Sequence, residues 1–282
     1  NESQVPSIYA HASFPTAFTM DTALGIDEGS SNLYGLFDFR RGRWEFKLPW
    51  GQLPVGPCEQ FVLDSDPPTL LVGCLAVFVM PKPGSNTIVA IEDSEVFGSG
   101  AGNAGLAAWS EMSGMPVVSR IRTWTMEQGA GVLVESMPGV ACGIAVSDSR
   151  VVGVRSVHEN AACGAFLPEP EFFSVPRDGG PIEAWAMPDR TPYGVIASTT
   201  WGDFAAVLGA IDANVPPSEL FSVRAVRMTD GAMRRLVPSE GSNSNFRSGD
   251  LALDDQPLYI AESPASNGES MHRIVRYRLD HF

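Results

Sequence analysis

The sequence predicts an all-β fold. Residues 43–48 and 273–280 both alternate charged with apolar side chains, which is the two-residue period of a strand with one buried face. The 28 glycines and 22 prolines indicate many turns and irregular connections between such strands. Strands that keep one face in water are typical of antiparallel sheets, so we expect an antiparallel architecture.

Apolar stretches bounded by turn residues give the expected strands in chain order. Residues 70–80 are continuously apolar and predict one central strand buried on both faces. Thr229-Asp230-Gly231 predicts a hairpin turn between its two flanking strands. Residues 33–50 are expected to contain the first strands. The other expected strands are 117–126, 131–137, 141–146, 151–157, 220–228, 232–237, 257–263 and 273–280.

Two short helices are expected. Thr200 and Asp203 have the spacing of a capping box, and four apolar residues follow at helical intervals, namely Phe204, Val207, Leu208 and Ile211. This pattern predicts a helix that ends near Asn214, and residues 106–112 form the second candidate. Residues 161–193 carry many prolines without periodicity and are interpreted as a long surface loop, and residues 240–248 as a polar loop.

The domain organisation is predicted to be an arm followed by one domain. Residues 1–30 show little periodicity and few charges, which favours an extended N-terminal arm that becomes ordered on neighbouring subunits. Residues 31–282 contain no internal repeat and no break between two cores, so they are expected to form a single domain.

The entry to the 43–48 strand carries a short motif, Arg41-Gly42-Arg43-Trp44, after an aromatic run. Together with the C-terminal strand-turn-strand, this motif resembles the major capsid proteins of picorna-like viruses. The resemblance implies an eight-stranded antiparallel jelly-roll β-sandwich with long loops. It also implies a structural subunit without enzymatic activity, released by polyprotein cleavage, that tiles an icosahedral shell. The expected partners are sister capsid proteins, symmetry copies and, weakly, genomic RNA, in the virion and in the host-cell cytoplasm.

Asp254 and Asp255 are the best paired carboxylates in the chain. Neighbouring carboxylates raise one another's pKa, so one of them could act as a general base. Some picorna-like capsid proteins resemble one another in using an Asp-Asp-Phe motif to promote maturation cleavage. Gln256 takes the place of the Phe here, so these residues are weak candidates for that role, beside the interpretation as a solvated turn.

Composition limits the function classes. The net charge is −14, so no broad basic surface for nucleic acid is expected. Charged residues make up only 18% of the chain against a usual value of about 25%, which favours extensive uncharged contacts with partners. The alternative function is a carbohydrate-binding or other β-sandwich module of an acidic extracellular protein.

Catalytic and cofactor motifs were sought and not found, so no cofactor and no metal site are predicted. The four histidines are His11, His158, His272 and His281, and no G-x-S-x-G nucleophile motif accompanies them. The glycine cluster 98–102 lacks the Gly-Lys-Ser/Thr of a phosphate loop. Asp64 and Asp66 are possible Ca²⁺ ligands but lack EF-hand spacing.

The four cysteines, Cys58, Cys74, Cys142 and Cys163, are widely spaced and are expected to be free thiols in a reducing compartment. The chain begins with polar residues and shows no signal-peptide pattern. The longest apolar run, 70–80, is too short to span a bilayer, so no membrane span is expected.

Overall fold

The structure is a computed structural model, and its described residues form antiparallel sheets. They comprise 22–27, 33–38, 43–49, 59–63, 69–73, 76–80, 89–93, 96–103, 105–163, 165–188, 193–211, 221–236, 245–253, 257–263 and 273–279. Within these ranges 22 strands form six sheets, and no helix occurs. The all-β antiparallel prediction is therefore confirmed.

Each sheet is a meander of consecutive strands. Sheet A contains β1 (Thr22–Asp27), β2 (Leu33–Asp38) and β3 (Arg43–Pro49). Sheet B contains β4 (Glu59–Leu63), β5 (Thr69–Gly73), β6 (Ala76–Met80) and β7 (Val89–Asp93). Sheet C contains β8 (Val96–Asn103), β9 (Leu106–Ser113), β10 (Val118–Thr125) and β11 (Gly129–Pro138).

The second half of the chain repeats this plan. Sheet D contains β12 (Val140–Val146), β13 (Arg150–Ser156), β14 (Glu171–Pro176) and β15 (Glu183–Ala186). Sheet E contains β16 (Tyr193–Trp201), β17 (Phe204–Ile211), β18 (Phe221–Arg227) and β19 (Ala232–Leu236). Sheet F contains β20 (Asn245–Leu253), β21 (Pro257–Ser263) and β22 (Arg273–Arg278).

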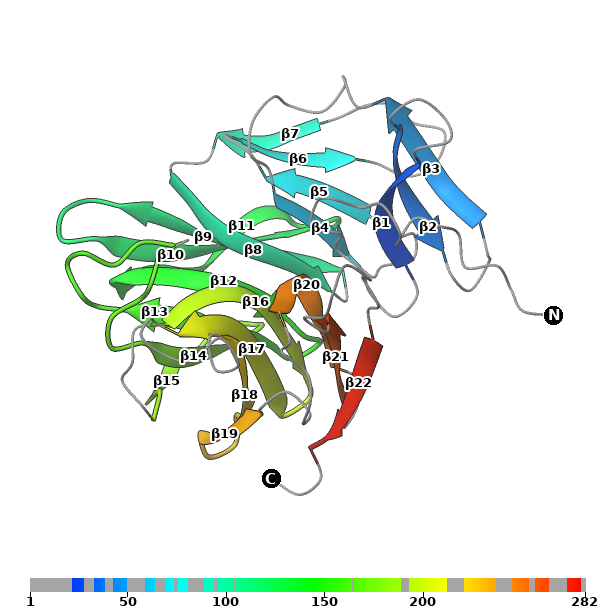
Figure 1. The fold of residues 1–282 in the computed structure, drawn as a ribbon. Helices are drawn as coiled ribbons and strands as arrows, with labels where there is room; N and C mark the ends of the chain where they lie inside the picture. Colours follow the sequence, from blue (N-terminus) through cyan, green and yellow to red (C-terminus); the bar gives the residue numbers. More distant parts are fainter. Residues whose placement is uncertain are drawn as a thin grey trace.

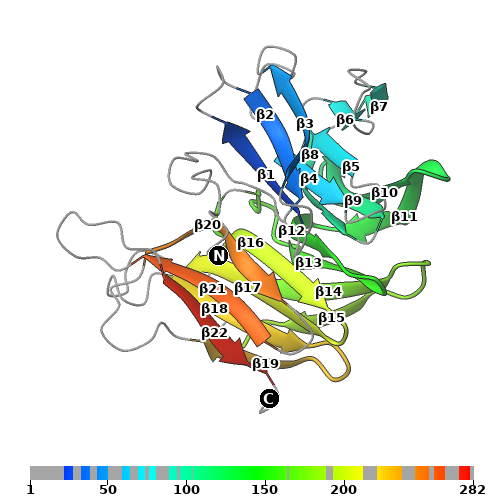
Figure 2. The ribbon, with the colours of Figure 1, turned by 90° about the vertical axis from the view of Figure 1, so that its right-hand side faces the viewer.

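The first strand of each sheet lies beside the first strand of the next. β1 contacts β4, β4 contacts β8, β8 contacts β12, β12 contacts β16, and β16 contacts β20. Figure 1 shows the sheets following one another around the molecule, from sheet A at the upper right to sheet F at the lower right. The same succession is visible from the side in Figure 2. Radial repetition of small antiparallel meanders is the plan of a β-propeller.

The hydrophobic core lies in layers between neighbouring sheets. One layer joins sheets C and D, a second joins D and E, and a third joins E and F. Adjacent residues of one strand enter different layers: Val151 packs toward sheet C and Val152 toward sheet E. Phe172 and Phe173 divide in the same way. Sheets D and E are therefore buried on both faces.

Burial on both faces corrects the predicted helices. Residues 200–211 belong to the hairpin in which β16 pairs with β17, and residues 106–112 belong to strand β9. Ala205 and Ala206 are both fully buried, although they lie on opposite faces of β17. The continuous apolar run 204–208 satisfies two core layers as a strand, whereas a helix would use only one face of it.

Other expected elements also differ from the structure. The apolar run 70–80 is not one strand but two, β5 and β6, which pair with each other. The loop predicted for 161–193 contains β14 and β15, and β20 begins at Asn245 inside the predicted polar loop. Strand β1, which pairs with β2, lies inside the range 1–30 given for the N-terminal arm, and the division into an arm and one domain stays a prediction. The six consecutive meanders do not confirm the eight-stranded jelly roll.

Several strand predictions are confirmed. The pairs β10–β11, β12–β13 and β18–β19 lie close to their expected positions. The C-terminal strands β21 and β22 pair as expected. In the last segment Leu279 is buried, Tyr277 is half-buried, and Arg276 and Arg278 are exposed, as the alternating pattern predicted. No helix long and apolar enough to cross a membrane is found in the part of the chain that is described.

Candidate functional site

The candidate site lies at one end of sheets D and E, which we call the turn end. It consists of the tight turns 147–149, 202–203 and 228–231, with the strand ends beside them. The backbone N–H of Met228 donates to the carbonyl of Asp203 at 2.7 Å, which joins the two turns of sheet E. Loops and turns on a rigid scaffold are where binding residues concentrate.

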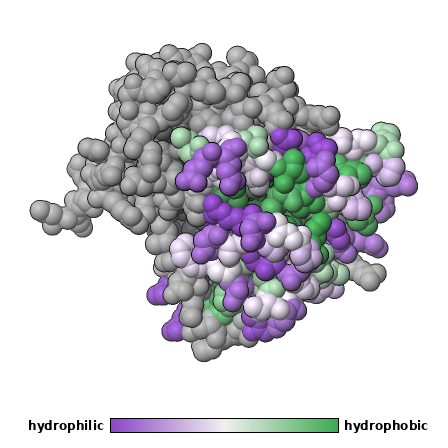
Figure 3. Space-filling model, turned by 180° about the vertical axis from the view of Figure 1, so that it is seen from behind, coloured by the Kyte–Doolittle hydropathy of each residue, from purple (hydrophilic) through white to green (hydrophobic). Residues whose placement is uncertain are grey.

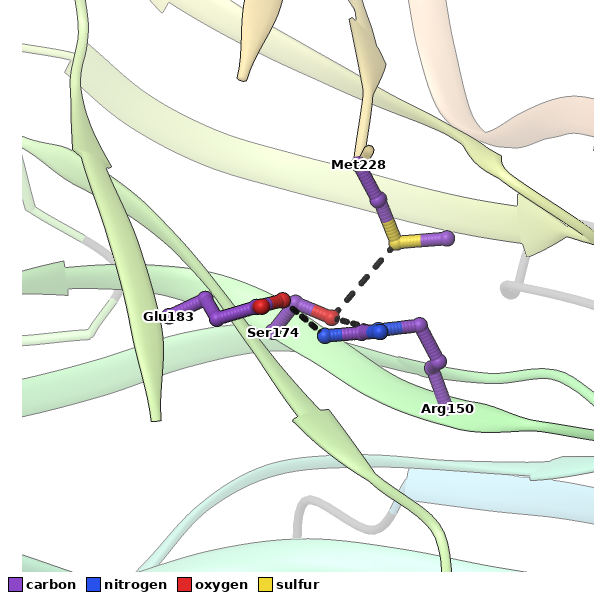
Figure 4. Close-up of polar contacts among 4 residues, drawn as sticks. All are labelled: Arg150, Ser174, Glu183 and Met228. Atoms are coloured by element: carbon purple, nitrogen blue, oxygen red, sulfur yellow. Dashed lines mark hydrogen bonds and ion pairs between the residues drawn. The ribbon is translucent and has the colours of Figure 1, made fainter. Parts of the chain in front are cut away.

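A polar cluster joins sheet D to the 228–231 turn of sheet E (Figure 4). Arg150 donates from Nε to Ser174 Oγ at 2.5 Å and pairs with Glu183 through its second terminal nitrogen. Ser174 Oγ in turn donates to Met228 Sδ at 3.6 Å. Ser174 is fully buried and its hydroxyl is used both as acceptor and as donor. Its role is therefore structural rather than nucleophilic.

The turn after β18 carries a two-point ion pair. Arg227 donates to Asp230 through Nε at 3.0 Å and through a terminal nitrogen at 2.6 Å. The hydrogen bonds from Arg227 and from the backbone N–H of Ala232 lower the pKa of Asp230 to about 2. Asp230 therefore stays an acceptor-only carboxylate at neutral pH. Paired Arg–carboxylate forks of this kind fix geometry as well as charge.

Gly231 fits this turn beneath an indole ring. Its φ is +71°, and an added Cβ would lie 1.9 Å from Cδ1 of Trp185. Trp185 belongs to β15 of sheet D and stacks on Phe172 with ring centres 6.0 Å apart. The turn of sheet E is thus held against sheet D by an aromatic pair as well as by the polar cluster.

Trp201 is the exposed aromatic residue of the turn end. It closes β16 opposite Phe204, and Phe204 is opposite Arg227 on β18. Residues directly opposite in antiparallel strands place their side chains on the same face. Trp201 is 41% exposed, whereas Phe204 packs partly into the core between sheets E and F. An exposed indole therefore shares one face and one end of sheet E with the Arg227–Asp230 pair.

Trp201 belongs to a small set of exposed large hydrophobic side chains. Figure 3 shows hydrophobic residues gathered among hydrophilic ones on the side opposite to the view of Figure 1. Among the described residues the exposed large hydrophobic side chains are Met115, Met126, Val132, Val157, Phe166 and Trp201. Trp201 lies on the same face of sheet E as the Arg227–Asp230 pair, with Phe204 of β17 between them.

The opposite end of sheet D, which we call the loop end, contains a disulfide bond. Cys142 of β12 is bonded to Cys163 of the 157–170 loop, with their Cα atoms 5.6 Å apart. Ala161 and Leu167 of the same loop enter the core between sheets D and E. The expected free thiols are therefore wrong for this pair. Cys58 and Cys74 lie outside the described residues.

Only some of the predicted site residues lie within the described part of the chain. Strand β3 begins at Arg43 and includes Trp44, whereas Arg41 and Gly42 lie outside the described residues, as do Asp254, Asp255, Asp64 and Asp66. His158 is exposed and accepts a hydrogen bond at Nδ1 from the backbone of Asn160. The other three histidines also lie outside the described residues.

Sequence reasoning missed Trp201 because it was assigned to a helix start. The signal that was available is Trp201-Gly202-Asp203, a tight-turn sequence between two apolar runs. The Asp230-Gly231 turn was found, but nothing in the sequence placed it beside Trp201, because that proximity depends on how β16, β17 and β18 pair.

Comparison with known proteins gives fold similarity without a family. No family model matches the sequence, and no curated protein matches it. A structure titled as a nidogen/laminin complex is 14% identical and aligns over 77% of this chain and 76% of that chain, with a TM-score of 0.51. A prolyl endopeptidase structure is 11% identical, with a TM-score of 0.54 over 94% of this chain. The tricorn protease is 10% identical, with a TM-score of 0.51 over 92% of this chain.

These likenesses show the fold alone. The chain spans only 41% of the prolyl endopeptidase chain and 30% of the tricorn protease chain. The neighbours are propeller-like, in agreement with the consecutive meanders and adjacent first strands described above.

Proposed function

We propose that this chain is a non-catalytic module that binds carbohydrate at the turn end. The observation that carries the proposal is the exposed indole of Trp201 on the same face as the Arg227–Asp230 pair. A sugar ring offers apolar C–H faces, which pack on an indole, and hydroxyl groups, which donate to carboxylates. Trp combines a large apolar surface with few rotatable bonds, so such contacts cost little entropy.

Asp230 suits the role of hydroxyl acceptor. Its carboxylate is half exposed, and Arg227 and Ala232 use three of its roughly four acceptor positions. The ion pair and the packing of Trp185 on Gly231 support a fixed geometry before a ligand arrives. Preorganised polar groups reduce the entropy lost on binding.

The disulfide supports an extracellular setting for this module. Disulfides persist in oxidising compartments and are rare in the cytosol. Cys142 and Cys163 form such a bond, and the acidic composition, with a net charge of −14, fits the same setting. The proposed location replaces the host-cell cytoplasm expected from the resemblance to capsid proteins. The capsid role itself stays a prediction, and no described contact favours it.

The test is binding of the purified, oxidised chain to immobilised glycans. We expect a defined glycan subset to be retained, and Trp201→Ala to weaken that binding about tenfold or more, as for a central aromatic contact. Trp201→Phe should keep part of the binding because a planar ring remains. Phe166→Ala is the matched control, since it removes an aromatic side chain of similar exposure from the 157–170 loop at the loop end instead. A chain that retains no glycan, or a Trp201→Ala variant that binds like the wild type, overturns the proposal.

A further inference from the structure

The outermost strands of sheets C, D and E differ in how they protect their free edges. β15 and β19 are short, with four and five residues. β15 carries Glu183, and β19 carries Arg234 and Arg235. Short length and charge are the usual means of preventing an edge strand from pairing with another chain. Both edges are therefore protected.

β11 carries this protection only in its last four residues, which include Glu135 and Pro138. It is ten residues long, and its first six residues, Gly129 to Val134, include no charged side chain. Val132 is 44% exposed, and Met126 in the preceding turn is exposed as well. β11 pairs with β10 on one side, and no described strand pairs with its other edge. β7 of sheet B lies near β11 but does not pair with it.

We propose that β11 pairs with β11 of a second copy of this chain, forming an antiparallel two-fold dimer across this edge. The occupant follows from the charge pattern of the strand. When the two-fold axis passes through Val132, this residue faces Val132 of the other copy, and the numbers of any two facing residues sum to 264. Glu135 therefore faces Gly129 of the other copy. No like charges then stand directly opposite, and Glu135 keeps its 3.2 Å ion pair with Arg120.

The edge of β19 is less suited to the same operation, because it offers only five residues and has an arginine at its centre. A two-fold axis at Arg234 of β19 would place two arginines directly against each other, and like charges directly opposite are destabilising. β15 offers only four residues to a partner. Among these three edge strands, self-pairing is therefore favoured at β11.

Long-range charge sets how the dimer responds to salt. Each chain carries a net charge of −14, so two copies repel each other at low ionic strength. Added salt screens this repulsion within a Debye length of about 8 Å at physiological strength. Dimer formation should therefore strengthen as salt is added. The dimer goes beyond the proposed carbohydrate binding and would make it bivalent, which raises avidity without a new contact.

Sedimentation velocity tests the proposal on the purified, oxidised full chain. We expect twice the chain mass of 30.2 kDa, with the dimer fraction rising with protein and salt concentration. Val132→Lys should yield a monomer with unchanged circular dichroism, because the two lysines would meet at the axis. Val132→Ile is the matched control and should remain a dimer.

Ala130→Lys provides a second variant in case Val132→Lys does not fold, since Ala130 is also exposed on β11. It should also weaken the dimer, because residue 130 faces Val134 of the other copy and a charged side chain would then lie against an apolar one. A wild-type chain that stays monomeric at high protein and salt concentration overturns the proposal. A dimer or larger particle that neither folded lysine variant weakens overturns it too. Glycan binding by a monomer would leave the proposed function intact, so the two proposals fail independently.

Discussion

The two ends of sheets D and E are stabilised in different ways. At the turn end, groups close in the sequence are joined by polar contacts, as in the Arg227–Asp230 pair and the hydrogen bond from Gly231 N to Arg227 O. At the loop end, the 157–170 loop is held by a disulfide and by buried side chains. A short turn satisfies part of its polar groups locally, and at the turn end the contact of Ser174 with Met228 adds a link between sheets. A long loop depends more heavily on contacts with distant residues to offset its entropy.

The close approach of two backbone segments at the loop end predicts that an added methyl group at Gly139 is costly. An added Cβ at Gly139, whose φ is +88°, would lie 2.1 Å from the backbone oxygen of Ser156. Backbone atoms inside a sheet cannot move aside, so Gly139→Ala should cost on the order of 4 kcal/mol in unfolding free energy. Urea denaturation measures this cost.

Gly179→Ala is the control for backbone conformation alone. Gly179 also has a positive φ, +92°, but nothing lies within 4 Å of an added Cβ. Its cost should be about 1–2 kcal/mol. Equal costs at Gly139 and Gly179 would contradict the close approach between the β11–β12 connection and the end of β13.

Removal of the disulfide should weaken the loop end selectively. A closed loop of comparable length contributes about 3 kcal/mol to stability, and Cys142 and Cys163 are 21 residues apart. The double variant Cys142→Ala/Cys163→Ala should lose stability of that order in urea denaturation. Limited proteolysis should then cut first within residues 157–170, leaving the 228–231 turn protected. First cleavage at the 228–231 turn would reverse the comparison.

The smallest expected effect is the pH dependence at the turn end. The pKa of Asp230 is lowered to about 2 from an ordinary value near 4. A carboxyl with a lowered pKa in the folded state contributes stability above its unfolded pKa, and this contribution is lost as the pH falls. The melting temperature should therefore fall between about pH 4 and pH 2, and Asp230→Asn should reduce that slope. An unchanged slope in the variant would show that Asp230 does not contribute.

The sequence alone determined where several of the regular strands and turns lie. Alternation located β22, and the apolar stretches around Ser147-Asp148-Ser149 and Thr229-Asp230-Gly231 located two hairpins of sheets D and E. These features are local, because a strand's period and a turn's chemistry depend on neighbouring residues. The turn that carries Asp230 in the candidate site could be predicted from the sequence for the same reason.

The tertiary structure decided the rest. Ala206 and Val207 enter different core layers, so β17 is a strand although its apolar spacing also fits a helix. The pairing of Cys142 with Cys163 and the placement of Trp201 in line with Arg227 depend on which strands become neighbours. The order of the sheets depends on burial between sheets, and a single strand's sequence records that it is buried but not which sheet covers it.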